Sequence, residues 1–151
     1  ERTLWPVDGN IRSDYETYMN GTDVFTFTIS EVPKLIKDFL NETETTVNEY
    51  DCFAMHQANL YILRQVAKKT KIPQEKMPIS MDRFGNTSVT SIPLSITDAY
   101  GEETEGNLNL FLCGFGVGLS WGVVSGKIDK SDVLPIIYSD EYYTDGGVSH
   151  D

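Results

Sequence analysis

The sequence has few of the residues that build redox or metal sites. Its 151 residues include two cysteines and two histidines. Neither Cys52 nor Cys113 has a CxxC partner, and His56 and His150 lie too far apart to match a zinc-ligand spacing. A metal site, and with it a metal-dependent hydrolase, is therefore not expected. Each cysteine lies in an apolar run typical of a buried strand, which predicts two small core side chains in a reduced, cytoplasmic setting.

Basic residues and long hydrophobic runs are also scarce. Twelve Lys and Arg residues oppose 23 Asp and Glu residues, for a net charge of −11. This balance argues against nucleic acids and anionic membrane surfaces as partners, because both bind proteins through cationic side chains. No apolar run reaches the roughly 20 residues that a membrane span needs. The chain is still 40% hydrophobic, which is enough for the core of one globular unit.

Hydrophobic periodicity in the first half predicts two helices around a buried strand. Residues 23–41 keep close to a 3.6-residue period, with Asp23 as the predicted N-cap. Pro33 lies inside this pattern, so we expect a kink or a late helix start near residue 30. Residues 50–55 predict a buried strand, and residues 59–71 a second helix that ends before Pro73. Residues 1–22 are polar and predict irregular structure.

The second half predicts one more helix and a pair of strands. The connector at 74–84 allows a short strand at 78–82, and Thr87 or Ser88 is expected to cap a helix reaching about residue 100. Ile92, Ile96 and Ala99 are expected to face inward. Residues 108–113 predict a strand, with residues 119–125 as its antiparallel partner after a glycine turn. The order of elements predicts an α/β fold with helices packed on a mixed sheet.

Three short motifs contain residues suited to thioester chemistry. Residues 56–59 read His-Gln-Ala-Asn, residues 85–88 read Gly-Asn-Thr-Ser, and residues 114–118 read Gly-Phe-Gly-Val-Gly. A neutral imidazole and a side-chain amide can both donate hydrogen bonds to a carbonyl oxygen that gains negative charge. A glycine loop lets a ligand approach backbone N–H groups. Taken singly, each motif also has a plain structural reading: a strand-end histidine, a Gly-Asn turn and a hairpin.

Together, the order and wording of the motifs resemble the C-terminal half of the 3-oxoacyl-acyl-carrier-protein synthase III family, which has the thiolase fold. The resemblance covers residues 19–126 and includes Met-Asn-Gly at 19–21 and Ile-Pro at 92–93. It implies the α/β C-terminal half of a thiolase-like fold. In this family a cysteine in the N-terminal half takes the acyl group, and this sequence does not contain that half.

The resemblance implies a decarboxylative Claisen condensation between an acyl thioester, loaded from acyl-CoA, and malonyl-acyl-carrier protein, without a cofactor. His56 and Asn86 match the catalytic residues that hold the malonyl thioester and stabilise its enolate. Val117 matches a backbone donor of the oxyanion hole. Gly116 and Phe115 match the acyl pocket, and Asn59 a residue of the pantetheine tunnel. The implied partners are the N-terminal half, acyl-carrier protein and coenzyme A thioesters, and the isolated chain is expected to be inactive.

The sequence departs from the family pattern at three positions. Val117 replaces a common glycine, and Tyr61 and Thr26 stand where basic residues are common. Lys68 and Lys69 remain as the predicted carrier-protein docking residues. Because those basic residues help to dock an acidic carrier, their loss and the net charge of −11 should weaken docking. A rival hypothesis is a non-catalytic module that binds acyl-carrier protein or a partner chain.

We divide the chain into a half-domain at 1–126 and a C-terminal extension at 127–151. The extension contains an apolar segment at 133–138, which is expected to add an edge strand, to cover exposed surface, or to be a decoration without chemistry. The apolar positions of the helix after residue 88 spread too far around it for burial on one side. We therefore expect an exposed apolar surface that drives self-association into a homo-oligomer or is covered by this segment.

Overall fold

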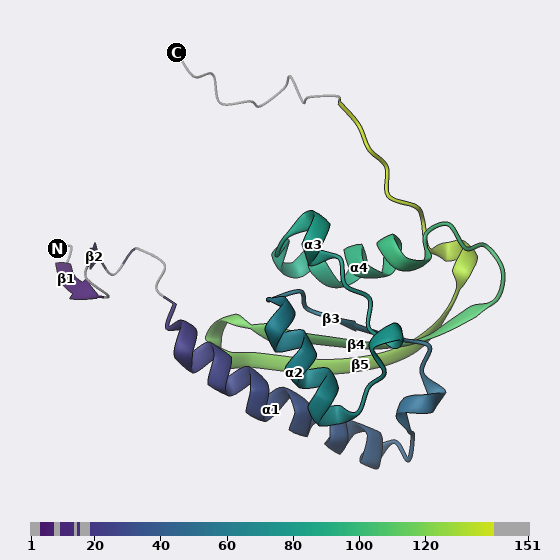
Figure 1. The fold of residues 1–151 in the computed structure, drawn as a ribbon, viewed down its shortest axis with the longest axis horizontal. Helices are drawn as coiled ribbons and strands as arrows, with labels where there is room; N and C mark the ends of the chain where they lie inside the picture. The colour runs from purple at the N-terminus through teal and green to yellow at the C-terminus, as the bar shows by residue number, and fades with distance from the viewer. Residues whose placement is uncertain (1–3, 8–9, 14, 16–18, 141–151) are drawn as a thin grey trace.

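The computed structural model describes residues 4–7, 10–13, 15 and 19–140 (Figure 1). Within these ranges the strands are β1 (Leu4–Val7), β2 (Asn10–Ser13), β3 (Cys52–Met55), β4 (Asn107–Gly116) and β5 (Ser120–Asp129). The helices are α1 (Gly21–Glu42), α2 (Leu60–Thr70), α3 (Met81–Phe84) and α4 (Ser91–Tyr100). Short 3-10 turns, such as Ser88–Thr90 before α4, join some of these elements.

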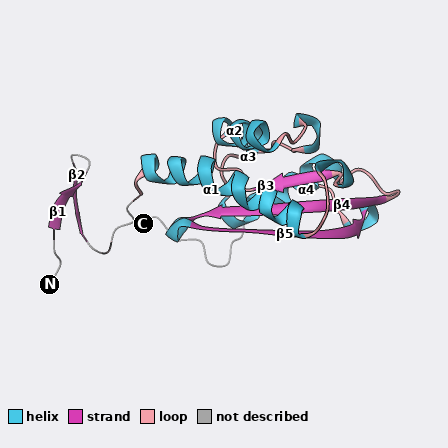
Figure 2. Cartoon of the chain, turned by 90° about the horizontal axis from the view of Figure 1, so that it is seen from below, coloured by secondary structure: helices cyan, strands magenta, loops and turns pink. Residues whose placement is uncertain are grey.

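The main sheet is mixed and has the strand order β3-β4-β5. β3 runs parallel to β4, with Met55 opposite Cys113, and β4 runs antiparallel to β5, with Gly114 opposite Gly122. β1 and β2 form a separate antiparallel pair (Figure 2). The parallel pair with an intervening helix, followed by a hairpin, confirms the predicted α/β fold with helices on a mixed sheet.

Helices cover both faces of the sheet. α1 and α2 pack on one face, where Phe53, Met55 and Phe111 are fully buried, and α4 packs on the other (Figures 1 and 2). Alternate strand residues point to opposite faces, so Cys52 and Ala54 join the cluster beneath α4. Each fully buried large apolar side chain contributes about 1.5–3 kcal/mol relative to exposure. The core therefore lies on both faces of β3 and β4, between the sheet and the helices.

Helix α1 differs from the sequence prediction at its start. Its N-cap is Asn20, whose Oδ1 accepts from the backbone N–H groups of Thr22 and Asp23, and not Asp23. The helix does not start late near residue 30 but runs from Gly21 through Pro33 to Glu42. The alternative of a kink at Pro33 stays a prediction. The apolar pattern begins only at residue 24, and it therefore placed the helix start three residues too late.

Several smaller predictions are wrong. Residues 78–82 form no strand: the connector instead has 3-10 residues Gln74–Lys76 and the short helix α3. Neither Thr87 nor Ser88 caps α4, which starts at Ser91 after Thr90 without a side-chain cap. Ala99 is exposed, whereas Ile96 is buried and Ile92 packs against the same cluster. At the N-terminus, residues 4–7 and 10–13 pair as strands where irregular structure was expected.

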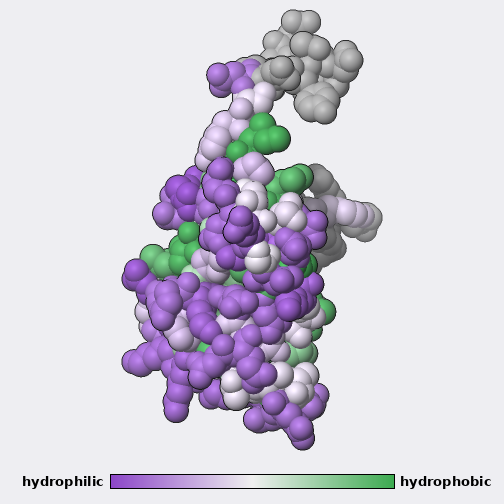
Figure 3. Space-filling model, turned by 90° about the vertical axis from the view of Figure 1, so that its right-hand side faces the viewer, coloured by the Kyte–Doolittle hydropathy of each residue, from purple (hydrophilic) through white to green (hydrophobic). Residues whose placement is uncertain are grey.

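The C-terminal segment is anchored at its first apolar residue. Val133 is buried with Ile96 and Leu108 beneath the sheet, whereas Leu134, Ile137 and Tyr138 are exposed. Figure 3 shows one largely hydrophilic face of the molecule, with hydrophobic side chains exposed mainly in its upper part. Residues 134–140 form no further strand, so an edge strand is not added within them. β5 continues to Asp129, across the expected boundary at residue 126. The division into half-domain and extension, and the expected homo-oligomer, stay predictions. No helix among the described residues is long and apolar enough to cross a membrane.

Candidate active site

The fold brings six of the predicted site residues to one cavity of about 730 Å³. They come from the ends of three segments that are far apart in sequence. The cavity is lined, among others, by His56, Asn59, Asn86, Phe115, Gly116 and Val117. Because β3 and β4 are parallel, their carboxyl ends meet at the same edge of the sheet, which is where α/β proteins bind ligands. Lys68 and Lys69 do not line this cavity.

His56 follows β3 directly and is held from three sides. Its backbone N–H donates to the Cys113 carbonyl at 2.9 Å, which continues the ladder between β3 and β4. The ring nitrogen Nδ1 lies 2.8 Å from Ser91 Oγ, and the ring meets the Phe115 ring edge-on at a centroid distance of 5.3 Å. Burial lowers the pKa of His56, and a backbone hydrogen bond with Ser88 acts in the opposite direction. The ring is therefore predominantly neutral at pH 7, and one of its two nitrogens still carries a hydrogen that it can donate to a carbonyl oxygen.

Asn86 is oriented by its own turn. Its Oδ1 accepts from the Ser88 N–H at 3.0 Å, so the Nδ2 donors face away from that bond. The residue before it, Gly85, has φ 69° and ψ −163°, a region open almost only to glycine. Gly85 thus bends the chain between α3 and the turn before α4, and it presents an exposed Asn86 at the cavity.

The glycine loop connects β4 to β5 and forms one wall of the cavity. Gly118 has φ 75° and Leu119 has φ 47°, so the loop turns through two left-handed residues. The Val117 side chain is 98% exposed. Beyond the loop, the Trp121 ring meets the Phe27 ring of α1 edge-on at a centroid distance of 4.8 Å, so the start of β5 packs against this helix.

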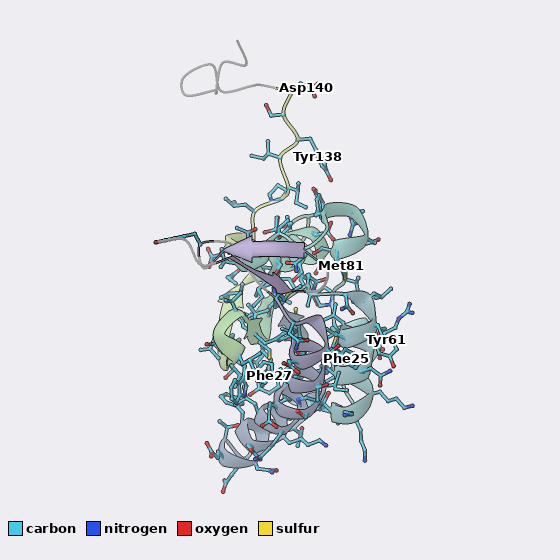
Figure 4. The ribbon with its side chains drawn as sticks, turned by 90° about the vertical axis from the view of Figure 1, so that its left-hand side faces the viewer. Phe25, Phe27, Tyr61, Met81, Tyr138 and Asp140 are labelled. Carbon is cyan, nitrogen blue, oxygen red and sulfur yellow. The ribbon has the colours of Figure 1, made fainter. Side chains whose placement is uncertain are left out.

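The other predicted residues have structural contacts of their own. Asn59 is the N-cap of α2, and its Oδ1 accepts from the Ile62 N–H at 2.8 Å. The Lys69 ammonium donates to the Ile29 carbonyl of α1 at 2.7 Å. Lys68 is exposed on the same helix. Tyr61 stacks on Phe25 at a centroid distance of 5.7 Å, so the two side chains face each other across α1 and α2 (Figure 4).

Neither cysteine reaches the cavity. Cys52 and Cys113 are fully buried, on opposite faces of the sheet. Burial is the main cause that raises the pKa of each thiol to about 12. A nucleophilic cysteine needs a lowered pKa and access to its substrate, so both have the properties of the core side chains that the sequence predicted. Among the described residues there is no cluster of three or more potential metal ligands.

Sequence reasoning overlooked Ser91 and Gln57, whose buried side chains form hydrogen bonds next to His56. Ser91 is the first residue of α4 and is buried beneath His56. The Gln57 side chain is also buried: its Nε2 donates to the carbonyls of Met55 and Pro78, and its Oε1 accepts from the Ser80 N–H. These bonds tie the connector to β3 in place of the expected strand. The signal available in the sequence was a polar residue next to an apolar run: Gln57 follows the strand at 52–55, and Ser91 precedes Ile92 of the helix.

Comparison with known proteins decides the family. Residues 40–128 match the family model for the C-terminal region of 3-oxoacyl-acyl-carrier-protein synthase III. The chain belongs to this synthase III C-terminal family. The match covers β3, α2, α3, α4 and β4, and nearly all of β5, and it includes the six predicted site residues at the cavity. The part of the cavity wall that α1 and the residues just before it supply, such as Asn20 and Phe25, lies outside the match.

Full-length members of the synthase III family are much longer than this chain. The chain is 40% identical to β-ketoacyl-acyl-carrier-protein synthase III of Porphyra umbilicalis, over 70% of this chain and 33% of that protein. It is 42% identical to the β-ketoacyl-acyl-carrier-protein synthase III of Staphylococcus saprophyticus, over 84% of this chain and 39% of that protein. A 3-oxoacyl-acyl-carrier-protein synthase structure from Burkholderia xenovorans superposes with a TM-score of 0.73 at 38% identity, covering 78% of this chain and 34% of that one. The chain thus spans about a third of the length of these relatives.

Proposed function

We propose that this chain supplies the histidine and asparagine of a Cys-His-Asn condensing site within a longer synthase III protein. The reaction would join an acyl thioester to malonyl-acyl-carrier protein with loss of CO2. The observation that carries the proposal is the shared cavity: His56 and Asn86 lie 30 positions apart in sequence, yet both line it together with the glycine loop. Family membership supports this assignment, because the motifs at these positions are those of synthase III.

The two donors have the chemistry that decarboxylation needs. When malonyl-thioester loses CO2, the electron pair of the broken C–C bond moves onto the thioester oxygen as an enolate. A neutral His56 can donate to this oxygen through Nε2–H, and Asn86 can donate through Nδ2–H. Charge develops on the oxygen only as the reaction proceeds, so both bonds strengthen toward the transition state. Removing one such donor typically costs about 10²–10³ in rate.

The remaining wall of the cavity would receive the acyl-thioester and the pantetheine arm. The backbone N–H of Val117 is proposed as an oxyanion donor, with Gly116 and Phe115 shaping the acyl pocket. Asn59 lies at the same cavity and would contact the pantetheine arm with its free Nδ2. Lys68 and Lys69 are proposed to attract the acidic carrier protein, although Lys69 also binds Ile29. No cofactor takes part in this scheme.

The nucleophile would come from the N-terminal half of the parent protein. Both cysteines of this chain are buried with raised pKa values, which supports a cysteine supplied by another segment. The isolated chain would then not bind an acyl group covalently, and it would not turn over malonyl-acyl-carrier protein. Coenzyme A thioesters would load the parent protein, as the family resemblance implies.

The proposal is tested in a full-length protein that contains this chain. His56→Ala and Asn86→Ala should each abolish malonyl decarboxylation but leave acylation of the nucleophilic cysteine largely intact. Release of CO2 from labelled malonyl-acyl-carrier protein and formation of the acyl-enzyme are measured separately. Lys127→Ala, an exposed change on β5 that lies outside the three motifs and opposite Asn109 of β4, is the control for both steps. Equal loss of both steps in the two site variants would show that the roles are misassigned.

A further inference from the structure

Ser91 lies beneath the His56 ring and is not accounted for by the proposed reaction. It is the first residue of α4, is 1% exposed, and approaches His56 across 35 positions of sequence. Its Oγ lies 2.8 Å from His56 Nδ1 and accepts from the Gln57 backbone N–H at 3.2 Å. Across residues 19–140 these are the hydrogen bonds of the Ser91 hydroxyl.

The donors and acceptors around Ser91 determine where its proton goes. A hydroxyl has one donor and two acceptor sites, and the Gln57 N–H occupies one acceptor site. The remaining partner of the hydroxyl is His56 Nδ1. The same ring also has a backbone hydrogen bond with Ser88, which raises the pKa of His56 and so involves a ring N–H as donor. If Nδ1 accepts, the hydroxyl proton is paired. If Nδ1 carried a proton and donated instead, the Ser91 proton would be left without a partner at a buried position, which is costly.

We propose that Ser91 is a positioning residue that holds neutral His56 in the tautomer with its proton on Nε2. The inference rests on the proposed function of His56, which needs an Nε2–H donor to the enolate oxygen. Nδ1 accepts from Ser91, and the edge contact with Phe115 fixes the plane of the ring. Which ring nitrogen of a histidine is protonated is set by the hydrogen bond that the other one makes.

The placement of Ser91 is rigid, which suits such a role. Its backbone starts α4, whose Ser95 and Ile96 are buried against the sheet, and its Oγ also holds the main chain of Gln57 next to the histidine. The hydroxyl therefore links the end of β3 to the start of α4, the two elements on either side of the cavity edge.

The tautomer of His56 can be measured by NMR, because the sequence has two histidines and replacing His150 leaves His56 alone. With ¹⁵N-labelled protein carrying His150→Gln, the ring signals report His56 alone, at about pH 8, where the ring is neutral. The expected spectrum shows an unprotonated Nδ1 and a protonated Nε2. Ser91→Ala should shift the spectrum toward a protonated Nδ1. Ser95→Ala, one turn further along α4 and equally buried, donates to the Ile92 carbonyl and should leave the spectrum unchanged.

A protonated Nδ1 in the protein with Ser91 intact overturns the proposal, even if Ser91→Ala does not fold. An unchanged tautomer in folded Ser91→Ala also overturns it. In the full-length protein, Ser91→Ala should lose malonyl decarboxylation while cysteine acylation is kept. If the tautomer changes but decarboxylation does not, then Ser91 holds the ring as proposed and the function assigned to His56 is wrong. The two failures are thus distinguishable.

Discussion

The side chain of Lys69 on α2 binds the carbonyl oxygen of Ile29 on α1 at 2.7 Å. That carbonyl is the one that Pro33 leaves free, because proline has no N–H to donate to the residue four positions before it. Lys69 therefore replaces the missing helix bond from a neighbouring helix. This contact explains how α1 continues through Pro33, and it gives Lys69 a structural role beside the proposed one in carrier docking.

Lys69→Met should lower the free energy of unfolding by about 0.5–1.5 kcal/mol, because the Ile29 carbonyl loses its partner. Lys68→Met, the next residue along and also exposed, should change it by less than about 0.5 kcal/mol. With Pro33→Ala, a backbone N–H becomes available to Ile29, and the effect of Lys69→Met should vanish. Urea denaturation of Lys69→Met, Lys68→Met, Pro33→Ala and the double variant Pro33→Ala/Lys69→Met measures this coupling. An equal loss of stability from Lys69→Met with and without the Pro33→Ala substitution would contradict it.

Capping and binding can be separated at Asn59. Its Oδ1 caps α2, so Asn59→Ala should cost about 1 kcal/mol of stability. Asn59→Asp keeps the capping oxygen and adds a favourable charge at the helix N-terminus, so stability should be retained. Asn59→Asp removes the amide donor, and binding of coenzyme A thioesters by the full-length protein should weaken in both variants. Normal binding by Asn59→Asp would exclude a donor role at the pantetheine arm.

Gly101 at the end of α4 should not tolerate a side chain. A Cβ atom there would lie 2.5 Å from the Thr97 carbonyl oxygen of α4, 2.7 Å from Pro135 Cα and 2.8 Å from the Leu134 carbonyl oxygen. Gly101→Ala is therefore expected to displace the C-terminal segment and to lower stability by about 1–3 kcal/mol. Gly21→Ala, at a helical position with no atom within 4 Å, is the matched control and should be neutral or slightly stabilising. Equal melting temperatures for the two variants would contradict the contact.

Stability should depend on pH through His56. Burial lowers its pKa below the ordinary 6.5, so between the two values the unfolded chain binds more protons than the folded chain. The free energy of unfolding therefore rises with pH across this window. The contribution of neutral His56 to it is fully present above about pH 6.5 and is lost as the pH falls through the pKa of the folded state. From about pH 7.5 to about pH 5, the free energy of unfolding should fall more steeply in the parent sequence than in His56→Gln. Parallel profiles would mean that the ring is not buried in its neutral form.

Both thiols should be inert until the chain unfolds. Burial and a pKa of about 12 leave almost no thiolate at pH 7. Iodoacetamide should label neither Cys52 nor Cys113 under native conditions and both in concentrated urea. Incubation with radiolabelled acyl-CoA should likewise leave no adduct on the isolated chain. A stoichiometric thioester on Cys113 would overturn the assignment of the nucleophile to another segment.

Local patterns in the sequence were enough for the main elements. The apolar runs around Phe53 and Phe111 predicted β3 and β4, because a strand buried on both faces needs continuous hydrophobic residues. The 3.6-residue periods predicted α1 and α2. The motifs at 56–59, 85–88 and 114–118 identified the family, since their order and wording are linear features of the chain.

Contacts between distant residues were decided by the tertiary structure alone. The bond from Lys69 to the Ile29 carbonyl depends on how α1 and α2 pack against each other. Ser91 meets His56 only because α4 begins beneath the end of β3. The Gln57 amide, and not a strand, joins residues 78–80 to β3. Hydrophobic periodicity records which face of an element is buried, but hydrogen-bond partners far apart in sequence are chosen only when the elements pack.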